Sequence, residues 1–249
     1  MRNSHYPTLA PMLNKLKKRS PIALADEEAI LGLPHWLAKI EAGAYLVREG
    51  DRPDNCCLLL SGFAYRSKNA GSGARQILAI QLRGDLVDLQ NAFLGQADHN
   101  VQALTQAEVA FIPCRAILKL GEGYPVVARA LWLDMLVDAS VSREWLLNVG
   151  QRNARQRVAH LLCELAWRQE AAGVSKRQIF ECPMTQEQIG DATGLTGVHV
   201  NRTIKVMRDD GLISITGRTV TITDWAKLQA AGDFSSTYLH QPQLAVIAA

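Results

Sequence analysis

One predicted helix, at residues 196–210, carries a row of polar and basic side chains that suit contact with a polyanion. Val200, Ile204 and Met207 repeat at i, i+4 and i+7, which is typical of a helix face packed on a core. Off this face lie His199, Asn201, Arg202, Lys205 and Arg208, and there is no acid among these positions. A guanidinium can donate paired hydrogen bonds to guanine O6 and N7, and an ammonium can pair with a phosphate. The helix therefore presents chemistry that suits nucleic-acid recognition.

The surrounding segment predicts that this helix is the second of a helix-turn-helix. Thr185 and Gln188 have capping-box spacing, so a short helix begins there, and Gly194 ends it. Thr196 caps the second helix, whose N-terminal amides add partial positive charge for a phosphate. Two short strands follow, joined by a turn that contains Arg218, which completes a winged helix-turn-helix. A helical hairpin with a merely solvated basic face is the alternative, and it explains neither the glycine turn nor the wing.

The residues before this motif predict a β-rich unit and then long helices. Strand-like segments separated by glycine turns occupy about 41–115, a texture typical of an antiparallel sandwich or barrel. Residues 20–40 read as helical, with a stop at Pro34. A glycine-free run over 126–149 predicts a long helix, which Gly150 breaks before a further helix begins.

The helix at 126–149 carries two apolar stripes, and each stripe needs a neighbour to cover it. One stripe includes Leu133, Val137, Val141 and Leu147. The other alternates steps of three and four residues, like a coiled-coil seam, and predicts dimer contacts at Trp132, Met135, Ala139, Ser142 and Leu146. We predict that the β-rich unit covers the first stripe and a second subunit covers the other. Burial of both stripes inside a monomer is the alternative.

The composition is that of a globular chain. Of 249 residues, 48% are apolar and 20% are charged, and the formal net charge of +3 neither demands nor excludes a polyanionic partner. No apolar stretch approaches the length of about 20 residues that spans a bilayer, and the N-terminus lacks the order of a secretory signal. Five cysteines without a CxxC pair argue against disulfides and favour a reducing compartment, the cytoplasm. We expect no membrane partner, no metal and no cofactor.

The order of these elements resembles that of the CRP/FNR family of bacterial transcription regulators over about residues 20–230. The resemblance is strongest in TQEQIGDATGLTGVHVNRTIKVMRDDGLI and EGDRPDNCCLLLSGFAYR. It implies an α+β chain with an N-terminal antiparallel β-roll, a jelly roll of the cyclic-nucleotide-binding type. It also implies a homodimer that binds two-fold symmetric double-stranded DNA and acts on transcription through RNA polymerase. The predicted domains are the β-roll at 20–122, a dimerisation helix at 123–149, a winged helix-turn-helix domain at 150–232 and a C-terminal tail at 233–249.

The predicted recognition helix matches the family's pattern only in part. Arg202 matches the arginine with which the family reads a guanine. Val198 falls where many members carry a glutamate that contacts a cytosine, and Gly197 falls where some carry a second arginine. The familiar half-site sequence is therefore not expected, and His199 and Asn201 are alternative readers. The DNA-contacting residues that we predict are Thr196, Val198, His199, Asn201, Arg202, Lys205 and Arg218.

The region that holds a cyclic nucleotide in some members also departs from the family's pattern. Asp85 stands at the ribose-contacting glutamate, and Asp98 with His99 stands where an arginine–serine pair binds the phosphate. A carboxylate this close to a phosphate repels it, so we predict that cyclic AMP is not the effector. The candidate effector contacts are Gly84, Asp85, Asp98, His99, Ser142 and Arg143. The identity and the existence of an effector stay open.

The cysteines do not match the iron–sulfur branch of the family, which needs an N-terminal cluster. No cysteine precedes Cys56. Cys56 and Cys57 are adjacent on a predicted strand, so their side chains point to opposite faces and pack in the core rather than share a ligand. Cys182 lies just before the helix-turn-helix, where ordinary packing is favoured and an oxidation switch is the alternative.

Two other classes of function are weighed against a transcription regulator. A metal-dependent β-barrel enzyme of the cupin type needs several histidines around one metal, and the β-region holds only His99. No GxSxG, HExxH, P-loop or dinucleotide fingerprint is present. A protein-interaction module that has lost DNA binding would show a disrupted recognition helix, and the basic positions here are intact. The sequence therefore favours a regulator that is not an enzyme.

Overall fold

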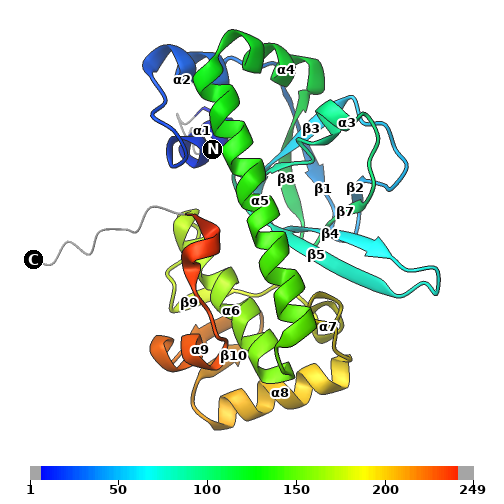
Figure 1. Ribbon diagram of the computed structural model, residues 1–249, viewed down its shortest axis with the longest axis vertical. Helices are drawn as coiled ribbons and strands as arrows, with labels where there is room; N and C mark the ends of the chain where they lie inside the picture. Colours follow the sequence, from blue (N-terminus) through cyan, green and yellow to red (C-terminus); the bar gives the residue numbers. More distant parts are fainter. Residues whose placement is uncertain (1–6, 241–249) are drawn as a thin grey trace, which may run out of the picture.

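Apolar strands in the first half of the chain form two antiparallel four-stranded sheets, which pack together as a β-roll (Figure 1). The computed structural model describes residues 7–240. One sheet has the strand order β1-β8-β3-β6 and the other β2-β7-β4-β5. The strands are β1 (Trp36–Ile40), β2 (Tyr45–Val47), β3 (Asn55–Ser61), β4 (Ala64–Asn69), β5 (Arg75–Gln81), β6 (Leu86–Val87), β7 (Asn100–Ala103) and β8 (Ala107–Pro113).

Strand β3 is a continuous apolar run because both of its faces are covered. Cys57 and Leu59 pack between the two sheets, whereas Cys56 and Leu58 pack against the helices that cover the outer face. Successive strand residues point to opposite faces, so a strand covered on both sides shows no polar alternation. The predicted opposite orientation and buried packing of Cys56 and Cys57 are therefore confirmed.

Four helices flank the roll, and their bounds correct the prediction for residues 20–40. They are α1 (Ala10–Lys17), α2 (Leu24–Leu31), α3 (Asn91–Leu94) and α4 (Cys114–Gly123). Helix α2 and its end before Pro34 agree with the prediction, but residues 36–40 form strand β1 rather than helix. The cause is tertiary, because β1 pairs along its whole length with β8.

Helix α5 (Pro125–Gln151) runs along the β-roll into the C-terminal half of the chain (Figure 1). The predicted break at Gly150 is wrong. The helix continues to Gln151 and ends because Arg152 is extended ahead of Asn153, which caps the next helix. An exposed glycine costs a helix only about 1 kcal/mol, so packing of the preceding turns outweighs it.

One face of α5 packs against its own chain. Val141 is buried and Val137 is half-buried, and both pack in the larger core, as predicted for their stripe. Leu147, which was predicted on the same stripe, is instead exposed. The opposite face, with Trp132 and Leu146, is exposed in the single chain.

The C-terminal domain combines helices with a three-stranded antiparallel sheet of order β10-β11-β9. Its elements are α6 (Ala154–Ala171), β9 (Ile179–Glu181), α7 (Gln186–Thr193), α8 (Gly197–Asp209), β10 (Ile213–Thr216), β11 (Thr219–Ile222), α9 (Trp225–Ala231) and a 3₁₀ turn, η1 (Ser236–Leu239). The apolar face of α6 forms the centre of the core. No helix within residues 7–240 is long and apolar enough to cross a membrane.

Part of the predicted C-terminal tail, 233–249, belongs to this core. Phe234 and Leu239 are buried. The hydroxyl of Tyr238 donates to Glu164 Oε2 at 2.7 Å, and the indole of Trp145 donates to the same oxygen at 3.0 Å. These bonds join η1, α5 and α6. The rest of the predicted tail, residues 241–249, lies outside the described residues.

Candidate nucleic-acid interface

The turn between α7 and α8 is built by capping bonds and by glycines. The hydroxyl of Thr185 accepts from the amide of Gln188, whose side chain accepts from the amide of Thr185, so the predicted capping box is present. Gly194 ends α7 with a φ of +66°, a conformation that other residues rarely adopt. A Cβ on Gly190 would lie 2.4 Å from the carbonyl oxygen of Leu195. The close approach of the two helices therefore requires glycine at position 190.

Helix α8 buries the face that its sequence predicts. Thr196 caps it by accepting from the amide of His199. Val200 and Met207 are fully buried in the core, and Ile204 is half-buried against it. These contacts fix the rotation of α8 and determine which side chains face solvent.

The opposite face of α8 presents free cations. Arg202, Lys205 and Arg208 are exposed, and none of them forms a hydrogen bond or ion pair with any residue between 7 and 240. His199 and Val198 are exposed beside them, and Val198 is 65% exposed. Cations that no internal carboxylate neutralises can bind an external anion at little cost.

Asn201 differs from its neighbours because it already has a partner. Its Nδ2 donates to Gln186 Oε1 on α7 at 3.0 Å. The bond links the start of one helix to the middle of the other, so a base reader at Asn201 would use only the remaining amide positions.

The N-terminus of α6 lies beside α8, which the sequence did not indicate. A groove there is lined by Asn153, Ala154, Arg155, Thr196, Val198, His199, Arg202, Thr203 and Val206. Asn153 caps α6 and exchanges bonds with Gln156, which leaves the amides of Ala154 and Arg155 without helical partners. Such amides and the helix dipole attract a phosphate. The Asn-x-x-Gln capping box after Arg152 was the available sequence signal.

The wing places Arg218 at its tip. Strands β10 and β11 pair from Ile213 with Ile222 to Thr216 with Thr219, so Gly217 and Arg218 form the turn. Arg218 is exposed and has no side-chain partner among the described residues. It is therefore available for an anion.

The β-roll holds the first helix of the motif directly. The Arg75 guanidinium pairs with Asp191 at 2.7 Å, and the side chain of Gln76 donates to the Asp191 carbonyl oxygen at 2.6 Å. From the other side, Arg157 on α6 donates to the Thr193 carbonyl oxygen at 3.1 Å. Strand β5 and helix α6 thus fix α7 in place.

Two known domain types match this architecture. A Crp-like helix-turn-helix domain matches residues 156–231, and a cyclic nucleotide-binding domain matches residues 37–124. The transcriptional activator protein FnrL of Cereibacter sphaeroides is 27% identical over 227 residues, which are 88% of this chain and 91% of that protein. The chain belongs to the CRP/FNR family of bacterial transcription regulators.

Another relative of this CRP/FNR regulator and a solved structure support the same family and fold. The transcriptional activator protein Anr of Pseudomonas aeruginosa is 29% identical over 77% of this chain and 78% of its own length. The structure of FixK2 from Bradyrhizobium japonicum shares the fold, with a TM-score of 0.74, 21% identity and coverage of 82% of this chain and 100% of that one. The CRP/FNR protein is thus a DNA-binding transcription regulator and not an enzyme, and the cupin-type alternative is set aside.

The predicted effector contacts Gly84 and Asp85 lie away from the other candidates. Asp85 is buried and pairs with Lys15 at 2.8 Å and with Arg168 at 3.2 Å. Burial alone would raise the pKa of Asp85, but Lys15 and Arg168 outweigh it and hold that pKa below its usual value. A Cβ on Gly84 would lie 3.0 Å from the carbonyl oxygen of Pro11 near α1. The structure therefore uses this pair to join helices to the roll, not to contact Asp98 or His99.

Asp98 and His99 belong to another network, in which His99 is buried and the side chain of Asp98 is exposed. The imidazole of His99 donates from Nδ1 to Asp98 at 2.6 Å and from Nε2 to Asp88 at 2.8 Å. Arg66 approaches Asp88 to 3.9 Å. Two carboxylate acceptors require a proton on each ring nitrogen, so this geometry favours the imidazolium. Asp88 and Arg66 were not among the predicted effector contacts, because only the folded roll brings them beside His99.

The stability of the CRP/FNR protein should therefore depend on pH through His99. Burial lowers the pKa of His99, but the bonds and charges of Asp88 and Asp98 outweigh burial and raise it above the ordinary value. A pKa raised on folding gives stability that is complete below the unfolded value of about 6.5 and is lost as pH rises through the folded value. We expect His99→Gln to reduce the free energy of unfolding more at pH 5.5 than at pH 8.5, in urea titrations.

The matched control for this prediction is His35→Gln. His35 bonds to the Leu33 carbonyl oxygen and to no carboxylate within residues 7–240. The substitution His35→Gln should therefore change the free energy of unfolding by a similar amount at both pH values. An equal loss at pH 5.5 and pH 8.5 for the His99 variant would contradict the imidazolium assignment.

The remaining effector candidates, Ser142 and Arg143, lie on the exposed part of α5. The hydroxyl of Ser142 donates to the Asp138 carbonyl oxygen of its own helix at 3.0 Å. Neither side chain contacts Asp98 or His99. Within one chain, the structure thus does not bring the six predicted effector contacts into a single site.

The cysteines are packed thiols. Cys182 is buried, and burial raises its pKa to about 11, so little thiolate is present at neutral pH. Sequence reasoning missed that Cys114 lies beside Cys56, with the two sulfurs 3.7 Å apart, because pairing of β3 with β8 brings them together. Within residues 7–240, no three His, Cys, Asp or Glu side chains are grouped to hold a metal.

Proposed function

We propose that the chain is a dimeric regulator that inserts α8 into the major groove of a two-fold symmetric DNA site. The observation that carries this proposal is the exposed face of α8, where Arg202, Lys205 and Arg208 have no internal partner. A helix in the major groove reads bases through side chains near its N-terminus. A module that had lost DNA binding would not keep this face basic and unpaired.

The division of roles on α8 follows from side-chain chemistry. Arg202 lies one turn into the helix, where its planar guanidinium can bond to guanine O6 and N7. Lys205 is a flexible point charge and is assigned to a phosphate. The N-terminus of α6 and the wing residue Arg218 are assigned to the phosphates on either side of the groove.

A second subunit is proposed for the exposed seam of α5. Trp132 is 61% exposed and Leu146 is 75% exposed, although both are large apolar side chains. Ala139 and Ser142 are exposed between them, and Met135 is half-buried. Exposed apolar residues at coiled-coil spacing are typical of a helix that pairs with its two-fold mate.

We further propose that the DNA-bound dimer contacts RNA polymerase in the cytoplasm. The proposal is supported by relatives that are named transcriptional activators. Sequencing the DNA that co-purifies with the chain from bacterial cells, followed by mobility shift on the recovered site, tests the function as a whole. A symmetric site that shifts supports the proposal, and the absence of any enriched sequence contradicts it.

A substitution at Val198 is expected to change the base preference of the protein. The exposed valine lies in the first turn of α8 and can contact the methyl group of a thymine, whereas a glutamate there accepts from cytosine N4. We expect Val198→Glu to shift one position per half-site from thymine toward cytosine by about 1 kcal/mol, measured on a library of half-site variants.

Val206→Glu is the matched control for Val198→Glu. Val206 is an exposed valine two turns further along the same helix. The glutamate introduced by Val206→Glu should weaken binding to all DNA sequences through repulsion from phosphates, with no change in base preference. The same uniform loss of affinity for Val198→Glu would show that Val198 does not contact the bases.

A further inference from the structure

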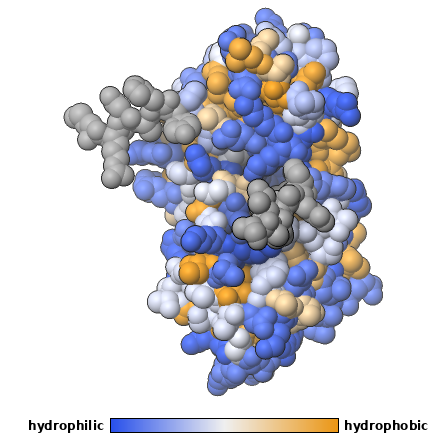
Figure 2. Space-filling view, turned by 90° about the vertical axis from the view of Figure 1, so that its left-hand side faces the viewer, coloured by the Kyte–Doolittle hydropathy of each residue, from blue (hydrophilic) through white to orange (hydrophobic). Residues whose placement is uncertain are grey.

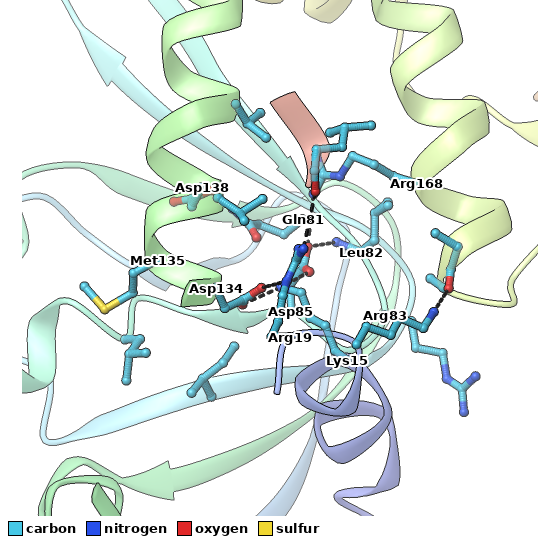
Figure 3. A pocket seen from close by; sticks show the side chains of 18 of the residues that line it. Lys15, Arg19, Gln81, Leu82, Arg83, Asp85, Asp134, Met135, Asp138 and Arg168 are labelled. Carbon is cyan, nitrogen blue, oxygen red and sulfur yellow. Dashed lines mark hydrogen bonds and ion pairs between the residues drawn. The ribbon is translucent and has the colours of Figure 1, made fainter. Parts of the chain in front are cut away.

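A polar cavity lies where the β-roll, α1, α5 and α6 meet (Figure 3). We call it the α1–α6 cavity, and its volume is about 150 Å³. Lys15 comes from α1, Arg19 from the turn just after it, Asp85 from the β5–β6 turn, Asp134 from α5 and Arg168 from α6. On the face shown in Figure 2, hydrophilic side chains dominate the middle of the molecule, between apolar patches above and below. The cavity adjoins the Asp98–His99 network, because Arg66 and Gln90 line the cavity and also approach Asp88 Oδ1, at 3.9 Å and 3.4 Å.

Some of the cavity's cations are already neutralised. Lys15 lies between Asp85 and Asp134, at 2.8 Å and 2.6 Å, and Arg168 pairs with Asp85 at 3.2 Å (Figure 3). Arg66 pairs with Asp138 at 2.8 Å. The carboxylates that line the cavity are Asp85, Asp134 and Asp138, and each of them already lies beside at least one cation.

Three further cations line the cavity, and two of them, Lys18 and Arg83, have no carboxylate partner among residues 7–240. Lys18 donates only to the carbonyl oxygen of Ala171, and Arg83 at the rim has no partner among residues 7–240. Arg19 donates to the carbonyl oxygens of Leu239 and His240. Its buried Nε has no hydrogen-bond acceptor among the described residues, and the nearest carboxylate oxygen, on Asp134, is 3.5 Å away.

The electrostatics agree with an unmatched positive cluster. Partial burial and the neighbouring charge of Arg19 lower the pKa of Lys18. Loss of hydration and repulsion by a like charge both disfavour the ammonium form of a lysine. An anion placed among Lys18, Arg19 and Arg83 would reverse it.

We propose that the α1–α6 cavity binds a small dianion through Lys18, Arg19 and Arg83. The guanidinium forks suit carboxylate and phosphate oxygens alike. A cavity of about 150 Å³ holds a molecule near the size of benzene, whereas drug-sized ligands occupy about 300 Å³ or more. The ligand is therefore smaller than a nucleotide, with a dicarboxylate and inorganic phosphate as the two possible sources of this chemistry.

The residues that line the cavity come from both domains, so a bound dianion can regulate DNA binding. Arg168, Ala171 and Ala172 belong to α6 of the DNA-binding domain, while Asp85 belongs to the β-roll. An anion that bonds to Lys18 competes with its bond to Ala171 at the end of α6. Binding thus changes the contact between the domains and the affinity for DNA; this regulatory step rests on the proposed function, whereas binding itself does not.

Calorimetric titration of the full chain with succinate and, separately, with inorganic phosphate tests the cavity. We expect one of these anions to bind at low ionic strength, and Lys18→Gln and Arg83→Gln each to weaken it at least tenfold. Arg52→Gln removes an exposed arginine that does not line the cavity and should stay within twofold of the wild type. Binding by neither anion, or binding that both cavity variants leave unchanged, would overturn the proposal. Binding of cyclic AMP alone would also overturn it.

Fluorescence anisotropy with labelled DNA, with and without the saturating anion, tests the regulatory step. A change in DNA affinity of threefold or more that Arg83→Gln abolishes supports it. An unchanged DNA affinity alongside anion binding contradicts the regulation and leaves the site intact. A wild-type chain that binds no DNA under either condition counts against the proposed function. Calorimetry would still test whether the cavity binds an anion.

Discussion

Arg202→Ala should cost about 1–3 kcal/mol of binding free energy at one symmetric base position per half-site and should relax the preference there. The side chain is exposed, has no internal partner and lies on the face of α8 opposite the buried Val200 and Met207. Its loss therefore leaves the fold of α8 intact and removes only a bidentate contact to a guanine. The measurement is binding to a set of half-site variants at several salt concentrations.

Lys205→Ala is the matched control, because it removes another exposed and unpaired cation three residues further along α8. A lost phosphate contact weakens all sequences alike and makes the dependence of affinity on salt shallower by about one unit per contact. If Arg202→Ala gave the same uniform loss with no change in base preference, its assignment as a base reader would be wrong.

Leu146→Glu should dissociate the proposed dimer. Leu146 is 75% exposed in the single chain, so the substitution removes no contact within the subunit. In a two-fold pair it removes two buried leucines, each contributing about 1.5–3 kcal/mol, and it brings two like charges near the axis. We expect the dissociation constant of the dimer to rise by more than about a hundredfold, measured by analytical ultracentrifugation.

Leu24→Glu provides the control for this variant. Leu24 is 72% exposed on α2, away from the α5 seam, and the chemical change is identical. It should leave the sedimentation behaviour unchanged. A wild-type chain that stays monomeric at micromolar concentration would contradict the dimer, as would equal effects of the two substitutions.

The DNA-binding motif was predictable because its signals are local. The Thr185 and Thr196 caps, the glycine that ends α7 and the spacing of Val200 and Met207 all act within a few residues of the chain. Local hydrogen bonds and one buried helix face determine such an element before any distant contact forms. The sequence therefore gave the helix-turn-helix, its wing and the exposed cations correctly.

The errors arose where distant contacts outweigh local preference. Residues 36–40 pair with β8, more than sixty residues away, and so become strand. Asp85 was interpreted from a family pattern, whereas its role depends on Lys15 and Arg168, which lie on other helices. No local sequence pattern indicates which helix will pack against a given turn.

By itself, the sequence determined a β-rich unit followed by a winged helix-turn-helix, and a row of apolar residues at coiled-coil spacing on α5, because these follow from periodicity, turns and capping along single elements. Only the tertiary structure showed the α1–α6 cavity and the clamp of Arg75 on Asp191. Both join side chains that lie more than a hundred positions apart. Such contacts depend on how whole elements pack, and packing is determined by the combined burial of many residues rather than by any short segment.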